Sequence, residues 1–287
     1  MTMRHMPTTY LAVAFEVLLD LLLPRSCAGC GRSGSAVCAA CEAAVDRPAF
    51  LAAPGQTATP KRRGPPCFAG AVYDGPCRRI LLAFKEKGRL DAPGPLVSAL
   101  ARAVVAARAM SAHDGPVVLV PVPSTRAAVR RRGFDHVRRL GDGAARVLCR
   151  AGVPARVVPM LSPARPVADQ AGLSAAERAA NIDGAFILRR APGGRRPRDH
   201  VSFAAGSFPS GVSAGRDGGG APGPLFVVID DVVTTGATLR EATRVLCAGA
   251  VPVSVAAVAA ATLAHRRPTR DDRPQAVRLP AIRVPEG

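Results

Sequence analysis

The feature that most constrains the fold of this chain is residues 225–239, which read LFVVIDDVVTTGATL. Five apolar residues at 225–229 predict a short strand that is buried on both faces. Two carboxylates, Asp230 and Asp231, close this strand, and a turn at 234–238 leads into a predicted helix that ends near residue 249. A strand followed by polar residues and a helix is typical of the ligand side of an α/β sheet.

The turn is rich in threonine and consists of Thr234, Thr235, Gly236, Ala237 and Thr238. Its backbone N–H groups and the helix dipole point at one place, which favours an anion there. The hydroxyls add donors, and Gly236 permits close approach of a phosphate or a positive φ. Asp230 and Asp231 cannot bind phosphate, but they suit sugar hydroxyls or a hydrated Mg²⁺. A ligand that combines phosphate, diol and metal is a ribose phosphate. The plainer interpretation is a strand and turn in which Asp231 caps the helix.

The pattern DD-x-x-TTG-x-T after an apolar strand resembles the phosphoribosyl pyrophosphate (PRPP) motif of type I phosphoribosyltransferases. The resemblance implies that Asp230 and Asp231 are catalytic and hold the ribose hydroxyls of PRPP. It also implies that residues 234–238 bind PRPP and that Mg²⁺ accompanies this ligand.

Four cysteines form two C-x-x-C pairs separated by residues 31–37: Cys27, Cys30, Cys38 and Cys41. Each pair presents two sulfurs to one point, so the pattern predicts a single tetrahedral zinc with four thiolates. Such a site is structural, because no open position is left for chemistry. A disulfide pair and a thioredoxin-like motif are the alternatives, but nothing in the sequence indicates export or a βαβ setting. Cys67 and Cys77 are candidates for a second metal site, although they lack the C-x-x-C spacing.

A predicted buried strand at 117–120 runs into a basic segment with four arginines: Arg126, Arg130, Arg131 and Arg132. We expect a loop here that clamps a diphosphate through forked guanidinium contacts. A solvated basic loop and a nucleic-acid patch are the alternatives. The formal net charge of +18 and the isoelectric point near 11.1 favour anionic partners in general. Two tyrosines and no tryptophan leave little aromatic surface on which single-stranded bases can stack.

Along the whole chain, predicted strands alternate with predicted helices. The strands are expected at 69–73, 117–120, 156–160, 185–188, 225–229 and 251–261. The helices are expected at 76–84, 95–112, 135–151, 174–181 and 239–249. This alternation predicts an α/β fold with a doubly wound, mostly parallel sheet.

The sequence also predicts how the chain divides. Residues 1–51 form an apolar helix (10–23) and the zinc module, residues 52–66 a linker, and residues 67–264 the sheet domain. A disordered insertion at 190–223 and a flexible tail at 265–287 are expected from their composition. The apolar helix is too short to span a bilayer, so we expect it to pack on the protein, with contact to a membrane surface as the alternative.

The combination of these parts resembles the ComF family, in which a cysteine zinc module precedes a type I phosphoribosyltransferase domain. The matching stretches are LLLPRSCAGCG, FKEKG, VPVPSTRAAVRRRGF, DQAGLSAAERAANIDGAF and VVIDDVVTTGAT. Two positions depart from the family pattern: Asp135-His136 stands where Asn-Gln is usual, and Glu86 stands where an aromatic often follows Lys85. The departures concern the basic segment more than the PRPP motif.

The resemblance implies a cytoplasmic protein with one of two functions. The first is an enzyme that transfers ribose 5-phosphate from PRPP to an acceptor, with Arg126, Arg130 and Arg132 on the diphosphate. The second is a non-enzymatic accessory protein of DNA uptake. It would bind single-stranded DNA or a helicase partner and use the pocket as a PRPP or nucleotide sensor. No feature of the sequence identifies an acceptor pocket.

Overall fold

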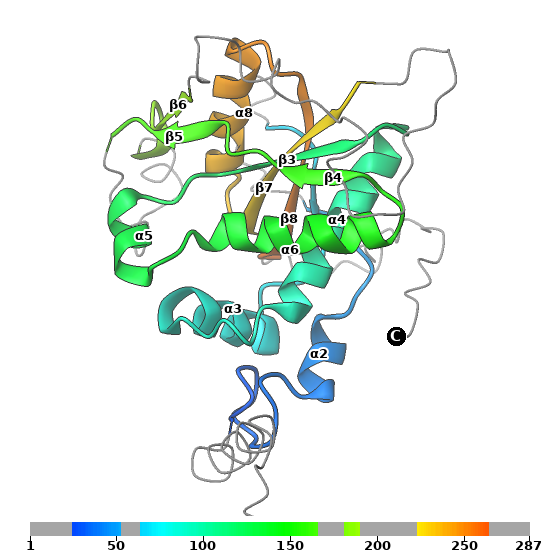
Figure 1. Cartoon of the computed structure of the whole chain (residues 1–287), viewed down its shortest axis with the longest axis vertical. Coiled ribbons are helices and arrows are strands. Elements are labelled where there is room, and N and C mark those ends of the chain that lie inside the picture. Colours follow the sequence, from blue (N-terminus) through cyan, green and yellow to red (C-terminus); the bar gives the residue numbers. More distant parts are fainter. Residues whose placement is uncertain (1–24, 53–63, 166–180, 190–222, 264–287) are drawn as a thin grey trace, which may run out of the picture.

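The computed structural model describes residues 25–52, 64–165, 181–189 and 223–263, and its centre is a six-stranded sheet (Figure 1). The strand order is β1-β2-β8-β7-β3-β4. These strands are β1 Phe50–Ala52, β2 Cys67–Ala69, β8 Val253–Ala261, β7 Leu225–Val233, β3 Val117–Pro121 and β4 Ala155–Val157. All neighbours run parallel except β1, which pairs antiparallel with β2 at the edge. The predicted α/β fold with a mostly parallel sheet is therefore confirmed.

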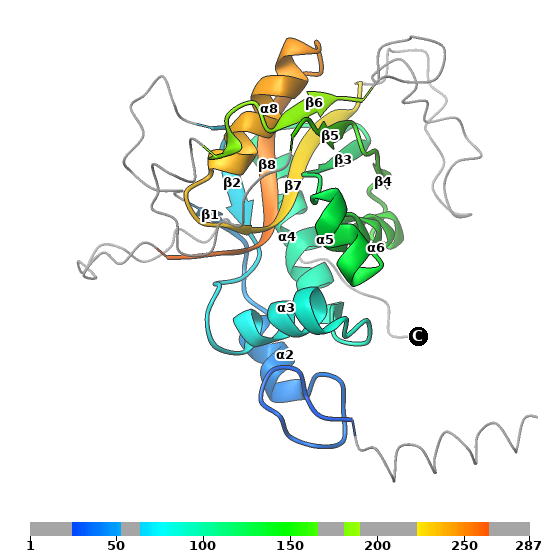
Figure 2. The same cartoon turned by 90° about the vertical axis from the view of Figure 1, so that its left-hand side faces the viewer.

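Helices cover both faces of this sheet, because its strands are apolar on both sides. Val117 and Leu119 of β3 pack in one cluster with α4 (Gly94–Met110) and α6 (His136–Arg150). Val118 and Val120 of the same strand pack in the other cluster with α8 (Ala237–Ala248). Figures 1 and 2 show α4 and α6 on one side of the sheet and α8 on the other.

Two short strands form a separate antiparallel sheet beside α8, built from β5 (Leu161–Pro163) and β6 (Phe186–Leu188). Glu241 of α8 accepts a hydrogen bond from the backbone N–H of Gly184 at 3.0 Å, which holds this sheet against the helix. The strand predicted at 185–188 therefore exists but does not belong to the main sheet. Its partner β5 consists of three residues directly after Met160 for which the sequence predicted no strand.

The N-terminal module packs at the opposite end of the molecule from α8, against α3 (Gly75–Lys87). It comprises the cysteine segment and α2 (Ala39–Val45). Arg79 of α3 donates a hydrogen bond to the carbonyl of Gly29, and Arg89 donates one to the carbonyl of Ser26 at 3.1 Å. Cys27 and Cys41 are buried in the same cluster as Phe84 of α3. The module is thus part of the main core at this end.

The basic segment after β3 is a short helix, α5 (Arg126–Arg132), and the predicted loop is wrong. Thr125 caps its start by accepting a hydrogen bond from the N–H of Ala128 at 3.2 Å, and Gly133 ends it with a φ of 79°. Threonine at the cap, alanine and arginine inside, and glycine after the last turn all favour a helix.

Two further boundaries differ from expectation. β7 continues to Val233, so Asp230 and Asp231 lie inside the paired strand rather than beyond it. β2 covers residues 67–69 instead of 69–73, and β1 reaches the first residue of the predicted linker. The strand predicted at 156–160 is shorter as well, since β4 covers 155–157.

Several predictions fall outside the described residues: the helix at 10–23, most of the linker, most of the helix at 174–181, nearly all of the insertion and the tail. Among the residues that are described, no helix is long and apolar enough to cross a membrane.

Candidate functional site

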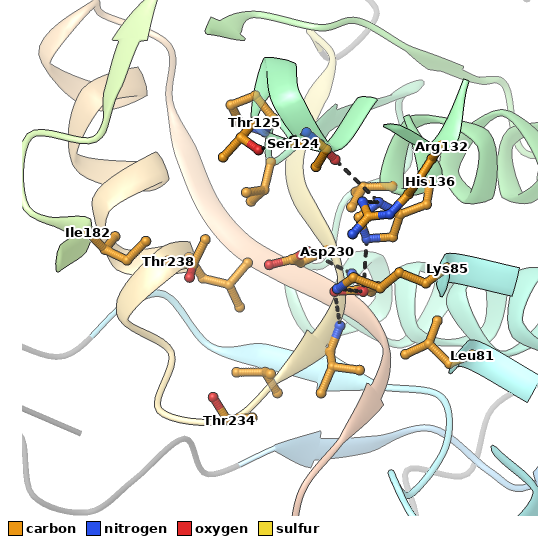
Figure 3. A pocket seen from close by; sticks show the side chains of 18 of the residues that line it. Leu81, Lys85, Ser124, Thr125, Arg132, His136, Ile182, Asp230, Thr234 and Thr238 are labelled. Carbon is orange, nitrogen blue, oxygen red and sulfur yellow. Dashed lines mark hydrogen bonds and ion pairs between the residues drawn. The ribbon is translucent and has the colours of Figure 1, made fainter. Parts of the chain in front are cut away.

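A cavity of about 720 Å³ lies at the carboxyl ends of β3 and β7 (Figure 3). Its walls come from the last turn of α3, from α5, from the first turn of α6 and from the turn into α8. Ligands bind at this edge of a parallel sheet because helix N-termini and strand-end side chains converge there. The cavity is therefore the candidate binding site.

Most of the residues that the sequence singled out line this cavity. They are Asp230, Asp231, Thr234, Thr235, Gly236, Thr238, Arg131 and Arg132. Ala237 does not line it. Arg126 lines a smaller neighbouring cavity of about 270 Å³, and Arg130 lines neither of the two. The reason is the helix: positions 127, 128, 131 and 132 of α5 share the face toward the main cavity, whereas a loop could have turned every arginine inward.

The turn into α8 has the geometry that an anion site requires. Gly236 is the N-cap of α8 with a φ of 72°, in the left-handed region that glycine adopts at little cost. No side chain caps the helix, although Thr235 Oγ1 accepts a long bond of 3.4 Å from the N–H of Ala237. The N–H groups of the first turn therefore keep their capacity to bind an anion. The alternative in which Asp231 caps α8 is wrong.

Asp231 is instead the buried centre of a polar network, with only 6% of its surface exposed. Its Oδ2 accepts from Lys85 Nζ at 2.8 Å and from His136 Nε2 at 2.9 Å, and its Oδ1 accepts from the N–H of Val232 at 2.8 Å. Burial opposes ionisation, but the charge of Lys85 and the bond from His136 hold the pKa of Asp231 well below its usual range. Asp231 is thus an ionised carboxylate whose two oxygens are already engaged.

Asp230 has a different environment, although it is the adjacent residue. It is half-buried, lines the cavity, and its Oδ1 accepts from the N–H of Asp231 at 2.8 Å. Burial and the negative charge of Asp231 raise the pKa of Asp230 well above its usual range. Figure 3 shows its carboxyl group pointing into the cavity, on the side of Thr238. Of the acidic pair, Asp230 is the member that can meet a ligand.

Local structure explains how Lys85 and His136 reach Asp231. Lys85 lies in the last turn of α3, directly after the buried Phe84. His136 is the first residue of α6, because Asp135 caps that helix by accepting from the N–H groups of Val137 and Arg138 at 3.1 and 3.2 Å. The two donors therefore arrive from separate helices.

The other ring nitrogen of His136 faces Ser124 and Arg132. Ser124 Oγ lies 3.2 Å from His136 Nδ1, and Arg132 Nη1 lies 3.3 Å from the same atom. With Nε2–H donated to Asp231, Nδ1 is the acceptor for these groups.

Sequence reasoning missed Lys85, His136 and Ser124 as members of the site. All three lie in stretches that carry the ComF resemblance, FKEKG and VPVPSTRAAVRRRGF with the two residues after it. No spacing rule connects them, because Lys85 and His136 meet only at Asp231, and Ser124 joins them through His136.

The donor set around the acidic pair does not form a Mg²⁺ site by itself. Asp231 has both oxygens occupied, and Asp230 is a single carboxyl group with a raised pKa. Within the described residues, the one group of side chains that lies close enough to hold a metal is the cysteine cluster. Mg²⁺ at the cavity would have to be held mainly by oxygens of a ligand and by water.

The four cysteines lie close enough to bind a metal ion, with their sulfurs within 4.8 Å of one another. Cys30 Sγ and Cys38 Sγ are 3.6 Å apart, close to the separation of about 3.8 Å in a tetrahedron with metal–sulfur bonds of about 2.3 Å. None of these cysteines forms a disulfide. The N–H groups of Gly29 and Cys38 donate to Cys27 Sγ at 3.4 and 3.3 Å.

The thiol chemistry of this cluster fits a cation. Burial opposes ionisation of Cys27, yet these backbone donors lower its pKa to about 6. Burial and the three neighbouring sulfurs raise the pKa of Cys41 to about 12. Four sulfurs this close can all be thiolates only with a cation among them. Cys67 and Cys77 do not belong to this cluster, and burial raises the pKa of each thiol to about 12.

Comparison with known proteins adds no assignment: no protein-family model and no curated protein matches this chain.

Proposed function

We propose that the chain is a phosphoribosyltransferase-like protein of the ComF type, which binds PRPP or a related ribose phosphate in the main cavity. The observation that carries the proposal is the cavity itself, where an uncapped helix start, a ligand-facing carboxyl group and partly buried cations surround one space. These three chemistries correspond to the phosphate, the ribose and the diphosphate of PRPP.

Each part of the ligand has a protein counterpart in this proposal. The first turn of α8 with Thr234, Thr235 and Thr238 binds the 5′-phosphate. Asp230 accepts hydrogen bonds from the ribose hydroxyls. Lys85 and Arg132 face the diphosphate, and Asp231 positions Lys85 by holding its ammonium group from behind.

Transfer of ribose 5-phosphate breaks the bond between C1′ and the diphosphate oxygen and forms a bond from C1′ to an acceptor. Positive charge develops on the ribose and negative charge on the leaving diphosphate. Lys85 and Arg132 stabilise the leaving group electrostatically, in a cavity that is partly closed to water. If Mg²⁺ is bound, held mainly by oxygens of the diphosphate and by water, it would lower the charge of the leaving group further. The acceptor is unidentified, and a binding protein that stops before transfer uses the same residues.

Calorimetric titration with PRPP in the presence of Mg²⁺ tests this proposal. We expect wild-type protein to bind PRPP and Asp230→Asn to bind it at least about tenfold more weakly, since an NH₂ donor replaces one of the two carboxyl oxygens that can accept from the ribose hydroxyls. Ribose 5-phosphate should bind as well, because it retains the phosphate and the diol. No affinity for either ligand in folded wild-type protein would refute the proposal. Pyrophosphate release from PRPP on addition of metabolite pools then separates an enzyme from a binding protein.

The cysteine cluster binds structural Zn²⁺ in this proposal. Four thiolates in a closed tetrahedral shell are the ligand set that zinc prefers, and the shell leaves no position for a reacting molecule. Metal analysis of the purified protein should give one zinc per chain.

A second function is favoured by the outer surface of α5 and α6. These two helices carry seven exposed arginines: Arg126, Arg130, Arg131, Arg138, Arg139, Arg146 and Arg150. Asp142 is one of the few carboxylates among them, and its contact to Arg138 is long at 3.9 Å. A surface of one charge sign suits a polyanion such as single-stranded DNA, which corresponds to the accessory role in DNA uptake.

Fluorescence anisotropy with a labelled single-stranded oligonucleotide tests this second function. Arg138→Gln with Arg139→Gln should reduce the DNA affinity and the slope of its salt dependence, because two phosphate contacts are lost. PRPP affinity should stay unchanged, since neither arginine lines the main cavity. DNA binding that is insensitive to both salt and these substitutions would argue against this surface.

A further inference from the structure

Arg132 is a cation of the main cavity that is largely buried and has only weak partners. Its side chain is only 10% exposed, and its Nε is buried without a hydrogen-bond partner in the described part of the chain. Its two polar contacts are long: Nη1 to His136 Nδ1 at 3.3 Å and Nη2 to Glu86 Oε1 at 3.4 Å. Charge-assisted hydrogen bonds between guanidinium and carboxylate are usually about 2.7–2.9 Å. A buried guanidinium with such weak partners is a site for an incoming anion.

Lys85 adds a second cation to the same place. Burial opposes its charge and nearby Arg132 lowers its pKa further, but Asp231 more than offsets both, so the ammonium stays charged with its pKa raised. Lys85 and Arg132 both line the cavity, and the bond of Lys85 to Asp231 occupies one of its three donors. Two cations that repel each other here favour a ligand with several negative oxygens.

Glu86 supplies the carboxylate that lies beside Arg132 in the structure. It lines the cavity and lies 3.4 Å from Arg132 and 3.7 Å from Arg131, yet it is 44% exposed and reaches both only through long contacts. It precedes the last residue of α3, which ends at Lys87, so its backbone is fixed while its side chain can turn to solvent. A contact of this kind is weak and can be exchanged for a better anion.

We infer that Glu86 is a built-in competitor: its carboxylate occupies the anion subsite at Arg132, and a compact oxyanion such as diphosphate binds there by displacing it. The inference rests on the proposed function for the identity of the oxyanion as the diphosphate of PRPP. It makes Glu86 a residue that sets the affinity of the site, and it excludes Arg126 and Arg130 from the subsite.

Isothermal titration with inorganic pyrophosphate, without Mg²⁺, tests the inference directly. We expect Glu86→Gln to bind pyrophosphate about fivefold more tightly than wild type, the change that loss of one partly exposed ion pair supports. Arg132→Gln should bind at least about tenfold more weakly. Glu86→Gln should bring no gain in the Arg132→Gln background, because the two residues act through one contact.

Asp142→Asn is the matched control. Asp142 has the same exposed fraction as Glu86, 44%, and also faces an arginine, but it lies outside the main cavity. Both substitutions remove one negative charge. An equal gain from both would overturn the inference, since the effect would then come from overall charge. No gain from Glu86→Gln, or no pyrophosphate binding by either protein, would also overturn it.

The two proposals fail in different ways. Suppose that Glu86→Gln gains pyrophosphate affinity, but wild type binds PRPP no more tightly than pyrophosphate. This result supports Glu86 as a competitor and refutes the ribose site. Suppose instead that wild type and Glu86→Gln bind PRPP with equal affinity, and Asp230→Asn weakens this binding. This result supports the ribose site and refutes Glu86 as a competitor.

Discussion

The acidic pair of β7 offers a strong test, because two neighbouring aspartates should respond in opposite ways to the same substitution. Asp231→Asn and Asp230→Asn both keep the shape of the side chain and remove one charge. Asp231 has a side chain that is 8% exposed and is bound to Lys85 and His136, whereas Asp230 is half-buried and faces the cavity. We expect the first substitution to destabilise the fold and the second to leave it intact.

The expected loss of stability for Asp231→Asn depends on Lys85, which stays in place without its carboxylate partner. Removing one member of a buried ion pair typically costs about 3–5 kcal/mol, because its partner stays buried without compensation. Lys85 is 29% exposed and can regain part of its hydration, so we expect the lower end, about 3 kcal/mol. The amide of the asparagine would also face the ammonium group of Lys85, donor against donor.

The expectation for Asp230→Asn follows from its raised pKa. Burial and the adjacent Asp231 already disfavour its charged form, so a neutral amide resembles the state that the fold prefers. The substitution removes repulsion between two neighbouring carboxylates. We expect a change between zero and a gain of about 1 kcal/mol in the free energy of unfolding near pH 7.

The two residues also differ in the sign of their pH dependence. The lowered pKa of Asp231 contributes stability that is present above the unfolded value of about 3.9 and is lost as the pH falls below it. The raised pKa of Asp230 has the opposite effect: the folded state retains a proton that the unfolded chain releases, so stability falls as the pH rises above about 3.9. The deficit of Asp231→Asn should therefore shrink toward acid pH, and the gain of Asp230→Asn should grow toward neutral pH.

Urea denaturation of the three proteins at several pH values measures these differences. Equal losses in both variants, or a larger loss for Asp230→Asn, would show that the division of roles within the pair is wrong. A loss for Asp231→Asn that does not depend on pH would show that its charge is not what stabilises the fold.

Three further perturbations probe other parts of the molecule. Cys27→Ser with Cys30→Ser should abolish metal binding and loosen the N-terminal module. Zinc-free wild-type protein with an intact fold, found by metal analysis and circular dichroism, would exclude the site. Gly70→Ala should destabilise the protein by about 3 kcal/mol, because the added methyl would lie 1.8 Å from the backbone oxygen of Ala99 and α4 would have to move. Thermal unfolding measures this loss, and an unchanged midpoint would contradict the close packing of Gly70 against α4. Deletion of residues 192–222 should cost little stability, as their composition offers few large apolar groups to bury, and a loss of cooperative unfolding would disprove it.

Much of the fold could be predicted because it depends on local patterns. The apolar runs at 117–120 and 225–229 identify buried parallel strands, since only strands covered on both faces lack polar alternation. The two C-x-x-C pairs predict the cysteine cluster, because a short chain segment holds both sulfurs of each pair. In the Thr/Gly turn, Gly236 takes the positive φ that the sequence allowed for.

The tertiary structure alone decided what each charged group does. The sequence treated Asp230 and Asp231 as equivalent, and they differ because Lys85 and His136 reach one of them from distant helices. It treated Arg126, Arg130 and Arg132 as equivalent as well, and the helical geometry of α5 turns only the last of these into the main cavity. The burial of a charged group and its interaction partners depend on how the whole chain packs. Local sequence patterns do not indicate which distant side chains will come into contact.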